Sequence, residues 1–189
     1  QRAGYKASLK EQKRVLIKKH NLILFQTQEK MIAALSKQID KVEHEMHGII
    51  KETNQLKRIY KLVTSVKGIG PQTALFLIAY SNGFTKFKNA RKFASYWGIA
   101  PFPNSSGTSI RGRTKVSNLA NKRIKSLLDL CAKSAIQNNF EMKIYYQKRI
   151  AEGKNKMSTI NIIRNKLLAR AFAVVKRGVP YIDTLKFAA

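Results

Sequence analysis

Apolar residues recur three and four positions apart over the first third of the chain, which is the spacing of one helix face. Between residues 6 and 62 there is no proline, and Gly48 is the only glycine. The pattern predicts a long helix with a heptad seam flanked by Lys and Glu. If continuous, about 57 residues at ~1.5 Å each would make a rod of roughly 85 Å. The seam consists of Ile32, Leu35, Ile39, Val42, Met46, Ile49, Thr53, Leu56, Tyr60 and Val63.

A rod with a single apolar stripe cannot bury that stripe alone, so the seam needs a partner. We favour a dimeric coiled coil, in which a second copy of the chain covers the stripe. The alternative is an antiparallel helical hairpin within one chain, because the regular spacing of apolar residues is lost before residue 28. The apolar side chains available for folding back are Val15, Leu16, Leu22, Ile23 and Phe25.

The stretch after the rod, residues 62–74, has the pattern of a helix-hairpin-helix element. Gly68 and Gly70 allow a tight turn and the close approach of a phosphate. Pro71 suits the first position of a helix, whose free N–H groups would then face an anion. The alternative is a glycine-capped helix junction that binds no ligand.

The rest of the chain reads as helices with one long irregular connection. Residues 98–116 hold three Gly and two Pro, so we expect a loop there, and a short hairpin within it is the only place for strands. Gly178 followed by Pro180 predicts the end of the last helix. The helices are expected at residues 71–81, 88–97, 118–138, 140–152 and 156–177.

These elements predict a mainly α fold in two parts. Residues 1–63 would form the long coiled-coil helix, and residues 64–189 a compact helical domain with the helix-hairpin-helix element and one long Gly/Ser/Arg loop. The net charge of +27 points to a polyanionic partner, with nucleic acid first and an anionic membrane surface second. The charge is concentrated in the second part: residues 65–189 carry 23 Lys/Arg against 4 Asp/Glu.

The single cysteine, Cys131, lies in an apolar helical pattern and is expected to be a buried, inert thiol. One cysteine forms no internal disulfide, which fits a reducing cytoplasm. No run of about 18 apolar residues is present, so we expect no segment that spans a membrane.

The candidate catalytic residues lie within residues 104–115, where serine and threonine hydroxyl groups are close in sequence to cationic side chains. Ser105 and Ser106 are possible nucleophiles toward a phosphate whose oxygens the cations would hold. All three histidines precede residue 65, so no Ser–His pair forms within the second part. Its four carboxylates are isolated in sequence, which argues against a complete two-metal site. The alternative is that this loop only contacts backbone phosphates and catalyses no reaction. The residues expected to bind nucleic acid are Gly68, Gly70, Arg91, Arg111, Arg113, Lys115 and Arg123.

A series of short motifs follows the long helix in a characteristic order. Val66-x-Gly68-Ile69-Gly70 is followed by Tyr96-x-Gly98-Ile99-x-Pro101 and then Ser106-Gly107. This order resembles the C-terminal part of insertion-sequence transposases that join a DEDD, RNase-H-like domain to a serine-bearing transposase domain. Some members of this family are called bridge-RNA-guided recombinases. The resemblance covers residues 30–182. Two positions depart from it: Lys67 stands where the family favours Pro, and Ala120 where it favours Gly in a run ending at Asn121.

The resemblance implies a DNA recombinase of a mobile element that exchanges strands through a covalent phosphoserine link. Ser106 matches the family's serine, with Ser105 as the fallback. Acidic residues of the DEDD domain, which this chain lacks, would supply Mg²⁺, so the chain alone is expected to be inactive. DNA, a structured guide RNA and a second copy bound through the coiled coil are the partners that the resemblance implies.

Overall fold

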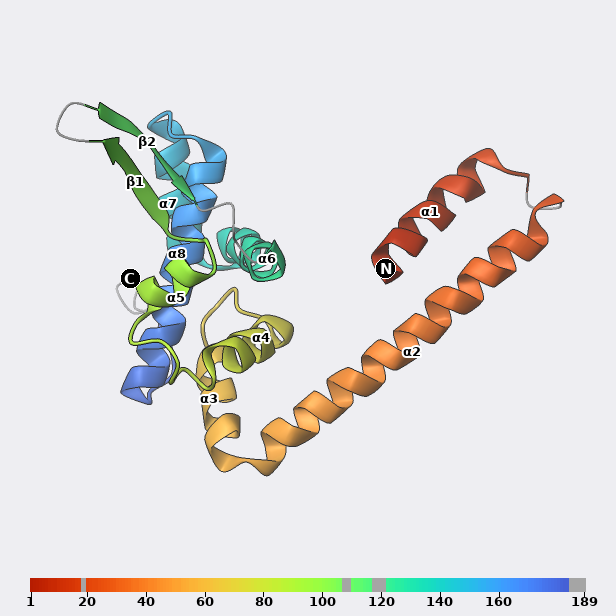
Figure 1. Ribbon diagram of the computed structural model, residues 1–189, viewed down its shortest axis with the longest axis horizontal. Helices are drawn as coiled ribbons and strands as arrows, with labels where there is room; N and C mark the ends of the chain where they lie inside the picture. The colour runs from red at the N-terminus through yellow and green to blue at the C-terminus, as the bar shows by residue number, and fades with distance from the viewer. Residues whose placement is uncertain (18–19, 107–109, 117–121, 184–189) are drawn as a thin grey trace. The chain divides into compact units, whose positions relative to one another are not determined.

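The computed structural model describes residues 1–17, 20–106, 110–116 and 122–183. Contacts along the chain divide it into two compact units, Gln1–Glu52 and Thr53–Ala189. The elements are α1 (Arg2–Val15), α2 (Leu22–Glu52), α3 (Asn54–Thr64), α4 (Pro71–Ser81), α5 (Ala90–Tyr96), β1 (Pro101–Ser106), β2 (Ile110–Val116), α6 (Lys122–Asn138), α7 (Phe140–Ala151) and α8 (Lys156–Arg177) (Figure 1). The mainly α fold predicted from the sequence is confirmed.

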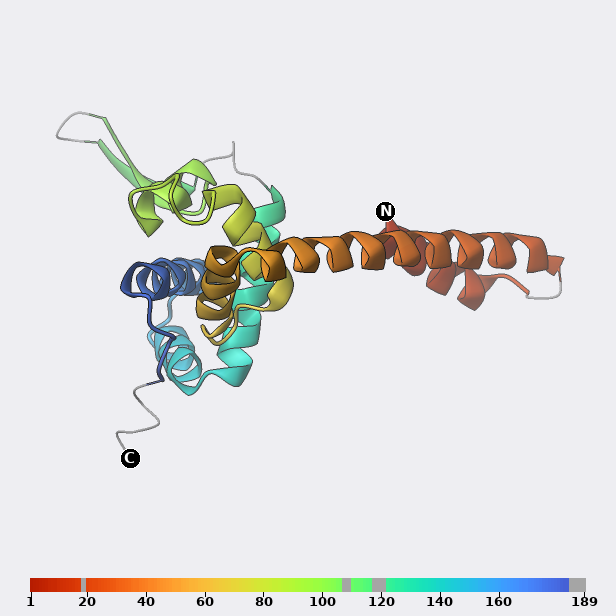
Figure 2. The ribbon, with the colours of Figure 1, turned by 90° about the horizontal axis from the view of Figure 1, so that it is seen from below.

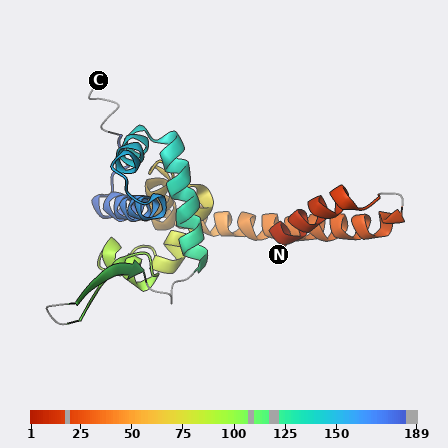
Figure 3. The ribbon, with the colours of Figure 1, turned by 90° about the horizontal axis from the view of Figure 1, so that it is seen from above.

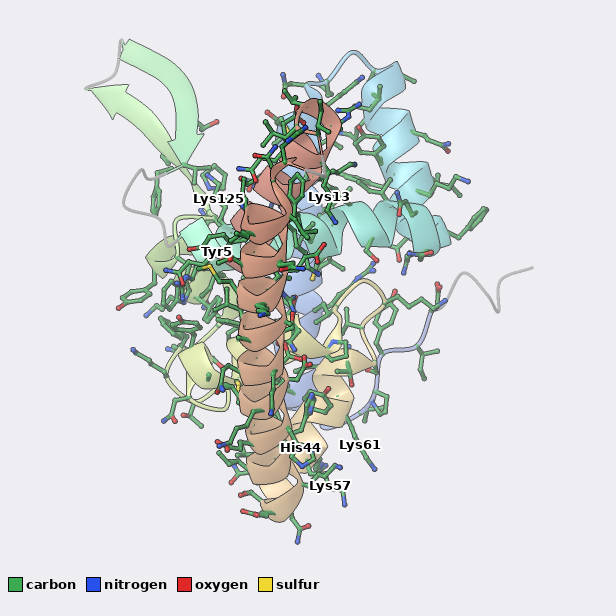
Figure 4. The ribbon with its side chains drawn as sticks, turned by 90° about the vertical axis from the view of Figure 1, so that its right-hand side faces the viewer. Tyr5, Lys13, His44, Lys57, Lys61 and Lys125 are labelled. Atoms are coloured by element: carbon green, nitrogen blue, oxygen red, sulfur yellow. The ribbon has the colours of Figure 1, made fainter. Side chains whose placement is uncertain are left out.

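The first unit is an antiparallel pair of helices, in which α1 lies against α2 (Figures 1 and 2). The backbone at Leu16 is extended, with φ −95° and ψ 139°, and α1 ends before it. Phe25 of α2 is buried, with 3% of its surface exposed. Lys13, labelled in Figure 4, forms an ion pair with Glu29 across the two helices at 2.6 Å. The chain therefore folds back as the hairpin alternative predicted, but the expected side chains do not cover the seam: Val15, Leu22 and Ile23 are 74%, 47% and 81% exposed, and only Phe25 is buried.

The continuous rod is wrong. Helix is interrupted between Val15 and Leu22 and again at Thr53, a β-branched residue whose backbone is extended at φ −99° and ψ 110°. Further along α2 the apolar seam stays open, since Val42 is 54% and Ile49 59% exposed. A coiled coil with a second copy stays a prediction for this exposed part of the seam.

The second unit is built around α8, which contacts α3, α5, α6 and α7. Figure 3 shows α5 and the β1–β2 hairpin on one side of α8 and α7 on the other, with α6 running past one end of α8. The boundary expected after residue 63 would place α3 with the long helix, but α3 packs on α4 and α8 within this unit. α3 therefore contributes to the core of the second unit.

The core of the second unit consists of apolar side chains that several helices bring together. Cys131 is buried at 4% exposed, as expected, and no described helix is long and apolar enough to cross a membrane. The largest fully buried side chains of this unit are Phe93, Leu77, Ile99, Ile124, Leu128, Met142, Ile163, Leu167, Leu168, Val63, Val66 and Val174.

Asparagine side chains start three helices of this unit. Asn89 accepts a hydrogen bond from the Lys92 amide, Asn139 from Met142, and Asn155 from Met157 and Ser158. Each bond satisfies a backbone donor that the first helical turn leaves unpaired. Gly178 ends α8 in the left-handed conformation at φ 67°, so the predicted end of this helix is confirmed.

The turn between α3 and α4 holds the two glycines of the predicted helix-hairpin-helix element. Gly68 has φ +100°, and a Cβ built on it would lie 2.7 Å from the Ala135 Cβ and 3.1 Å from the Cys131 carbonyl oxygen. This glycine therefore lets the turn pack against α6. Lys67, where the resembled family favours proline, pairs with the buried Asp183 carboxylate at 3.0 Å.

Replacing Gly68 with alanine is expected to destabilise the second unit by about 3 kcal/mol. The added methyl group meets α6 backbone and side-chain atoms, and L-residues rarely adopt a positive φ. Gly70→Ala is the control, because Gly70 has φ −81° and a methyl group added there would meet nothing within 4 Å. Denaturant unfolding of both variants measures the difference, and similar losses of stability would refute the packing role of Gly68.

Candidate nucleic-acid interface

The candidate serines lie on a two-stranded antiparallel hairpin that projects from the helices of the second unit (Figures 1 and 3). Ser105 pairs with Arg111, and Ser106, the last residue of β1, pairs with Ile110. The hairpin allowed by the sequence is therefore confirmed, in place of a wholly irregular loop. Gly107, which follows the serine in the motif, lies outside the described residues, as does Asn121.

The pairing of the two strands is irregular around Pro103. Phe102 pairs with Lys115 and Asn104 with Gly112, so Pro103 stands opposite two residues of β2, Arg113 and Thr114. Proline has no N–H to donate to a ladder, which explains why the bulge occurs at this position. The hairpin thus brings the backbones carrying Arg111, Arg113 and Lys115 beside the strand that carries Ser106.

A groove runs along α8 at the base of the hairpin, and we call it the α8 groove. One part, of about 330 Å³, is lined by Arg91, Pro101 and Asn161, among others. The neighbouring part, of about 440 Å³, shares Pro101, Asn161 and Ile162 with the first and reaches Lys125 and Arg164. Figure 4 labels Lys125 on α6. Cationic side chains therefore stand at both ends of the groove. The remaining lining residues are Ala90, Ala100, Thr114, Val116, Asn155, Met157, Ser158, Asn165 and Ala169.

Asparagine side chains of α8 hold the chain in place where the hairpin begins. The Asn161 side-chain amide donates to the Ile99 carbonyl oxygen at 3.1 Å. The Asn165 amide donates to the Asn161 carbonyl oxygen at 2.8 Å. Ile99 is fully buried, so the entry to β1 is fixed both by packing and by hydrogen bonding. This anchoring positions the hairpin relative to the groove beneath it.

A buried cation lies at the Lys125 end of the groove. The Arg164 side chain is 6% exposed and pairs with Asp129, which also accepts from Lys133 at 2.8 Å. Burial alone would raise the pKa of Asp129, but the hydrogen bonds and charges of Lys133 and Arg164 outweigh it and hold that pKa below its usual value. The Arg164 Nε has no hydrogen-bond partner among the described residues. The Lys125 end of the groove therefore has a positive group whose position is fixed by its ion pair with Asp129.

Sequence reasoning missed Asn161, Arg164 and Lys125. A signal is present for Asn161 alone, because Ser158, Asn161 and Asn165 repeat at spacings of three and four, which places them on one side of the helix. Such a polar stripe on a buried helix is typical of side chains that bind something other than the core. Lys125 carries no comparable signal, since its role depends on how α6 packs against α8.

The structure does not bring all the predicted residues together. Arg91 lies in the α8 groove, whereas Arg123 lines a separate pocket with Phe76 of α4. Ser106 is five residues beyond Pro101, or roughly 17 Å along an extended strand. The groove and the candidate serine thus lie toward opposite ends of β1.

The predicted phosphate site at the helix-hairpin-helix turn is partly filled by the protein itself. The Gly70 backbone amide hydrogen bonds to the Cys131 sulfur, which also donates to the Thr73 hydroxyl at 3.2 Å. Burial raises the pKa of the Cys131 thiol, and these two hydrogen bonds offset only part of the rise. This thiol is therefore structural, and the Gly70 amide is already engaged.

The described residues do not fit a metal site. They contain no group of three or more His, Cys, Asp or Glu side chains that could hold an ion. Asp129, which pairs with Arg164 of the groove lining, also pairs with Lys133.

Comparison with known proteins adds to this picture. Residues 60–147 match the model of the transposase IS116/IS110/IS902 family. A pilin gene-inverting protein of Moraxella bovis is 28% identical over 147 residues, covering 77% of this chain and 46% of that protein. A 43.6 kDa insertion element IS110 protein of Streptomyces coelicolor is 27% identical over 154 residues, covering 80% of this chain and 38% of that protein.

The chain spans less than half the length of these curated relatives. The family match begins within α3 and ends within α7, so it includes the glycine turn, α5 and the hairpin. The comparisons thus relate the segment that carries the candidate serines to the transposases of the IS116/IS110/IS902 family.

Proposed function

We propose that this chain is part of a DNA transposase or recombinase that cleaves and rejoins strands through a covalent link to Ser106. The observation that carries the proposal is the hairpin itself. It holds the candidate serine beside a strand with three cationic residues, within the segment that matches a transposase family. Residues 53–128 carry 14 Lys/Arg and no Asp/Glu, so the surface of this segment favours a polyanion.

The geometry supports a path for one DNA strand. Its backbone phosphates would meet Arg91 and Lys125 in the α8 groove and follow β1 to Ser106. The ~17 Å between Pro101 and Ser106 correspond to about five nucleotides at ~3.4 Å each. In the covalent step the Ser106 hydroxyl oxygen forms a bond to phosphorus while the bond from phosphorus to one deoxyribose oxygen breaks, and the serine proton is transferred to that leaving oxygen, which becomes a free hydroxyl.

This covalent step can be tested by trapping. A full-length transposase that contains this chain is incubated with its DNA, denatured and digested, and the peptide that retains a nucleotide is identified by mass spectrometry. The proposal expects the peptide to contain Ser106. In the resembled family an acidic domain supplies Mg²⁺, so the 189-residue chain alone is expected to bind DNA without forming the adduct. An adduct formed by this chain alone would contradict the need for a second domain.

Binding in the groove predicts a specific effect of Arg91. Arg91→Ala is expected to weaken binding to duplex DNA of any sequence and to reduce the dependence of log affinity on log salt by about one unit. Arg149→Ala is the control, because Arg149 lies on α7 and already pairs with Glu152 at 3.4 Å. Affinity titrations between low and moderate salt measure both slopes, and equal slopes for the two variants would refute contact at Arg91.

We further propose the remaining partners that the resemblance implies. A structured RNA presents the same phosphates to the acid-free segment as DNA does. A second copy of the chain would cover the exposed seam of α2, where Val42 and Ile49 are open to solvent. The RNA proposal rests on the basic surface of the second unit, and the proposed self-association rests on the exposed apolar side chains of the first unit.

A non-catalytic helix-hairpin-helix binding module is the other function considered. The order α3, glycine turn, α4 favours it. However, Gly68 packs against α6 and the Gly70 amide engages Cys131, so the turn offers fewer free donors to a phosphate. Retained DNA binding without any adduct in the full-length protein would favour this second function.

A further inference from the structure

The short helix α5 carries an exposed aromatic side chain on a strongly basic surface. Tyr96 is 61% exposed, whereas Phe93 and Trp97 of the same segment are buried. A tyrosine that is more than half exposed gains little from packing in the core, so its place on this surface needs another explanation. Lys86, Lys88, Arg91 and Lys92 are all exposed nearby in the sequence.

The Tyr96 ring is held in place although it is exposed. Its centroid lies 5.4 Å from that of Phe87 and 5.0 Å from that of Trp97, which meets it edge-on at 83°. Lys86 Nζ lies 5.5 Å from the Tyr96 centroid and 5.8 Å from the Phe87 centroid. A ring fixed on two sides loses little side-chain entropy when a ligand stacks on it.

The cations around this ring have no acidic partner among the residues that the structure describes. None of the ion pairs between described residues involves Lys86, Lys88, Arg91 or Lys92. The sequence offers no carboxylate between residues 53 and 128. Cations without acidic partners next to a rigid aromatic ring are the combination that binds single-stranded nucleic acid, where bases stack and phosphates pair with Lys and Arg.

We propose that Tyr96, Phe87 and Lys86 form a platform on which an unpaired nucleobase stacks, and we call it the α5 platform. Stacking of a base on an aromatic ring is stronger than an exposed contact between an ammonium group and that ring. An incoming base therefore displaces Lys86 from the ring face, and the freed ammonium pairs with a phosphate of the same strand. The inference rests on the proposed function only for the origin of this strand, which is DNA opened during strand exchange or a bound RNA.

The test uses the 189-residue chain and four probes of equal length, about ten nucleotides. These are oligothymidylate, oligouridylate, an abasic DNA oligomer and a DNA duplex. Wild type is expected to bind oligothymidylate about tenfold more tightly than the abasic oligomer. Trp97 is the only tryptophan and contacts Tyr96, so its fluorescence should change with the base-containing probes and not with the abasic one. A preference between oligothymidylate and oligouridylate assigns the strand to DNA or RNA.

Variants separate stacking from charge. Tyr96→Leu is expected to remove the tenfold advantage of bases over abasic sites, and Tyr96→Phe to keep it. Phe140→Leu, which changes an aromatic side chain 64% exposed on α7, should have no effect. If Tyr96→Leu discriminates bases as wild type does, the α5 platform is refuted. Failure of wild type to bind the duplex would instead contradict the proposed function, because duplex binding does not need an unpaired base.

Discussion

Ser106→Ala is expected to abolish the covalent protein–DNA adduct of the full-length enzyme while leaving DNA affinity within about twofold. Alanine lacks the oxygen that would bond to phosphorus, whereas the cations that hold the DNA backbone are unchanged. Because Ser106 ends β1, the substitution alters no ladder pairing beyond that with Ile110. Denaturing gel electrophoresis of labelled DNA measures the adduct, and a mobility shift under native conditions measures binding.

Ser105→Ala is the matched control, since it removes the same hydroxyl one residue earlier, opposite Arg111. An adduct that survives Ser106→Ala and disappears with Ser105→Ala would move the assignment by one residue. An adduct that survives both substitutions would eliminate a serine of β1 as the nucleophile. DNA binding lost together with the adduct would show that the variant had perturbed the hairpin rather than the chemistry.

Asp129→Asn is expected to lower the stability of the second unit by about 3 kcal/mol and its melting temperature by roughly 10 °C. The substitution keeps the shape of the side chain but leaves the buried Arg164 guanidinium without its counter-charge. A buried charge that loses its partner keeps its desolvation cost, which is why this loss exceeds the value of a surface pair. Thermal unfolding followed by circular dichroism measures the change.

The same chemical change at an exposed pair provides the control. Glu152→Gln removes a carboxylate that is 40% exposed and pairs with Arg149, so its cost should stay below about 0.5 kcal/mol. The contribution of the Asp129 carboxylate to the free energy of unfolding also depends on pH. Its folded pKa is lowered, so the contribution is complete above the usual pKa of about 3.9 and is lost as pH falls through the folded value. Equal losses for both variants at pH 7, or a difference that grows in acid, would refute the buried pair.

Local sequence signals predicted much of the second unit. Pro71 at the start of α4 and Gly178 after α8 predicted helix ends, because the conformations of these residues decide locally where a helix begins or ends. Residues 98–116 were predicted as the only place for strands, because two prolines and three glycines exclude a helix there.

Features that depend on distant contacts were not predicted. Nothing local at Thr53 marks a helix break, since the apolar seam continues through it. α3 separates from α2 there and packs on α4 and α8, which lie beyond it in sequence. The α8 groove likewise exists only because Asn161 reaches Ile99, 62 positions away, and Lys125 of α6 comes to the same place.

The hairpin of two strands has a consequence for how the protein behaves at high concentration. Both of its strands are sheet edges, and such edges tend to pair with copies of themselves and aggregate. Here β1 carries Pro101 and Pro103, which cannot donate to a neighbouring strand, and β2 carries three cationic residues in alternation. Two such hairpins repel each other. The composition that suits them to a polyanion therefore also guards the chain against edge-to-edge self-assembly.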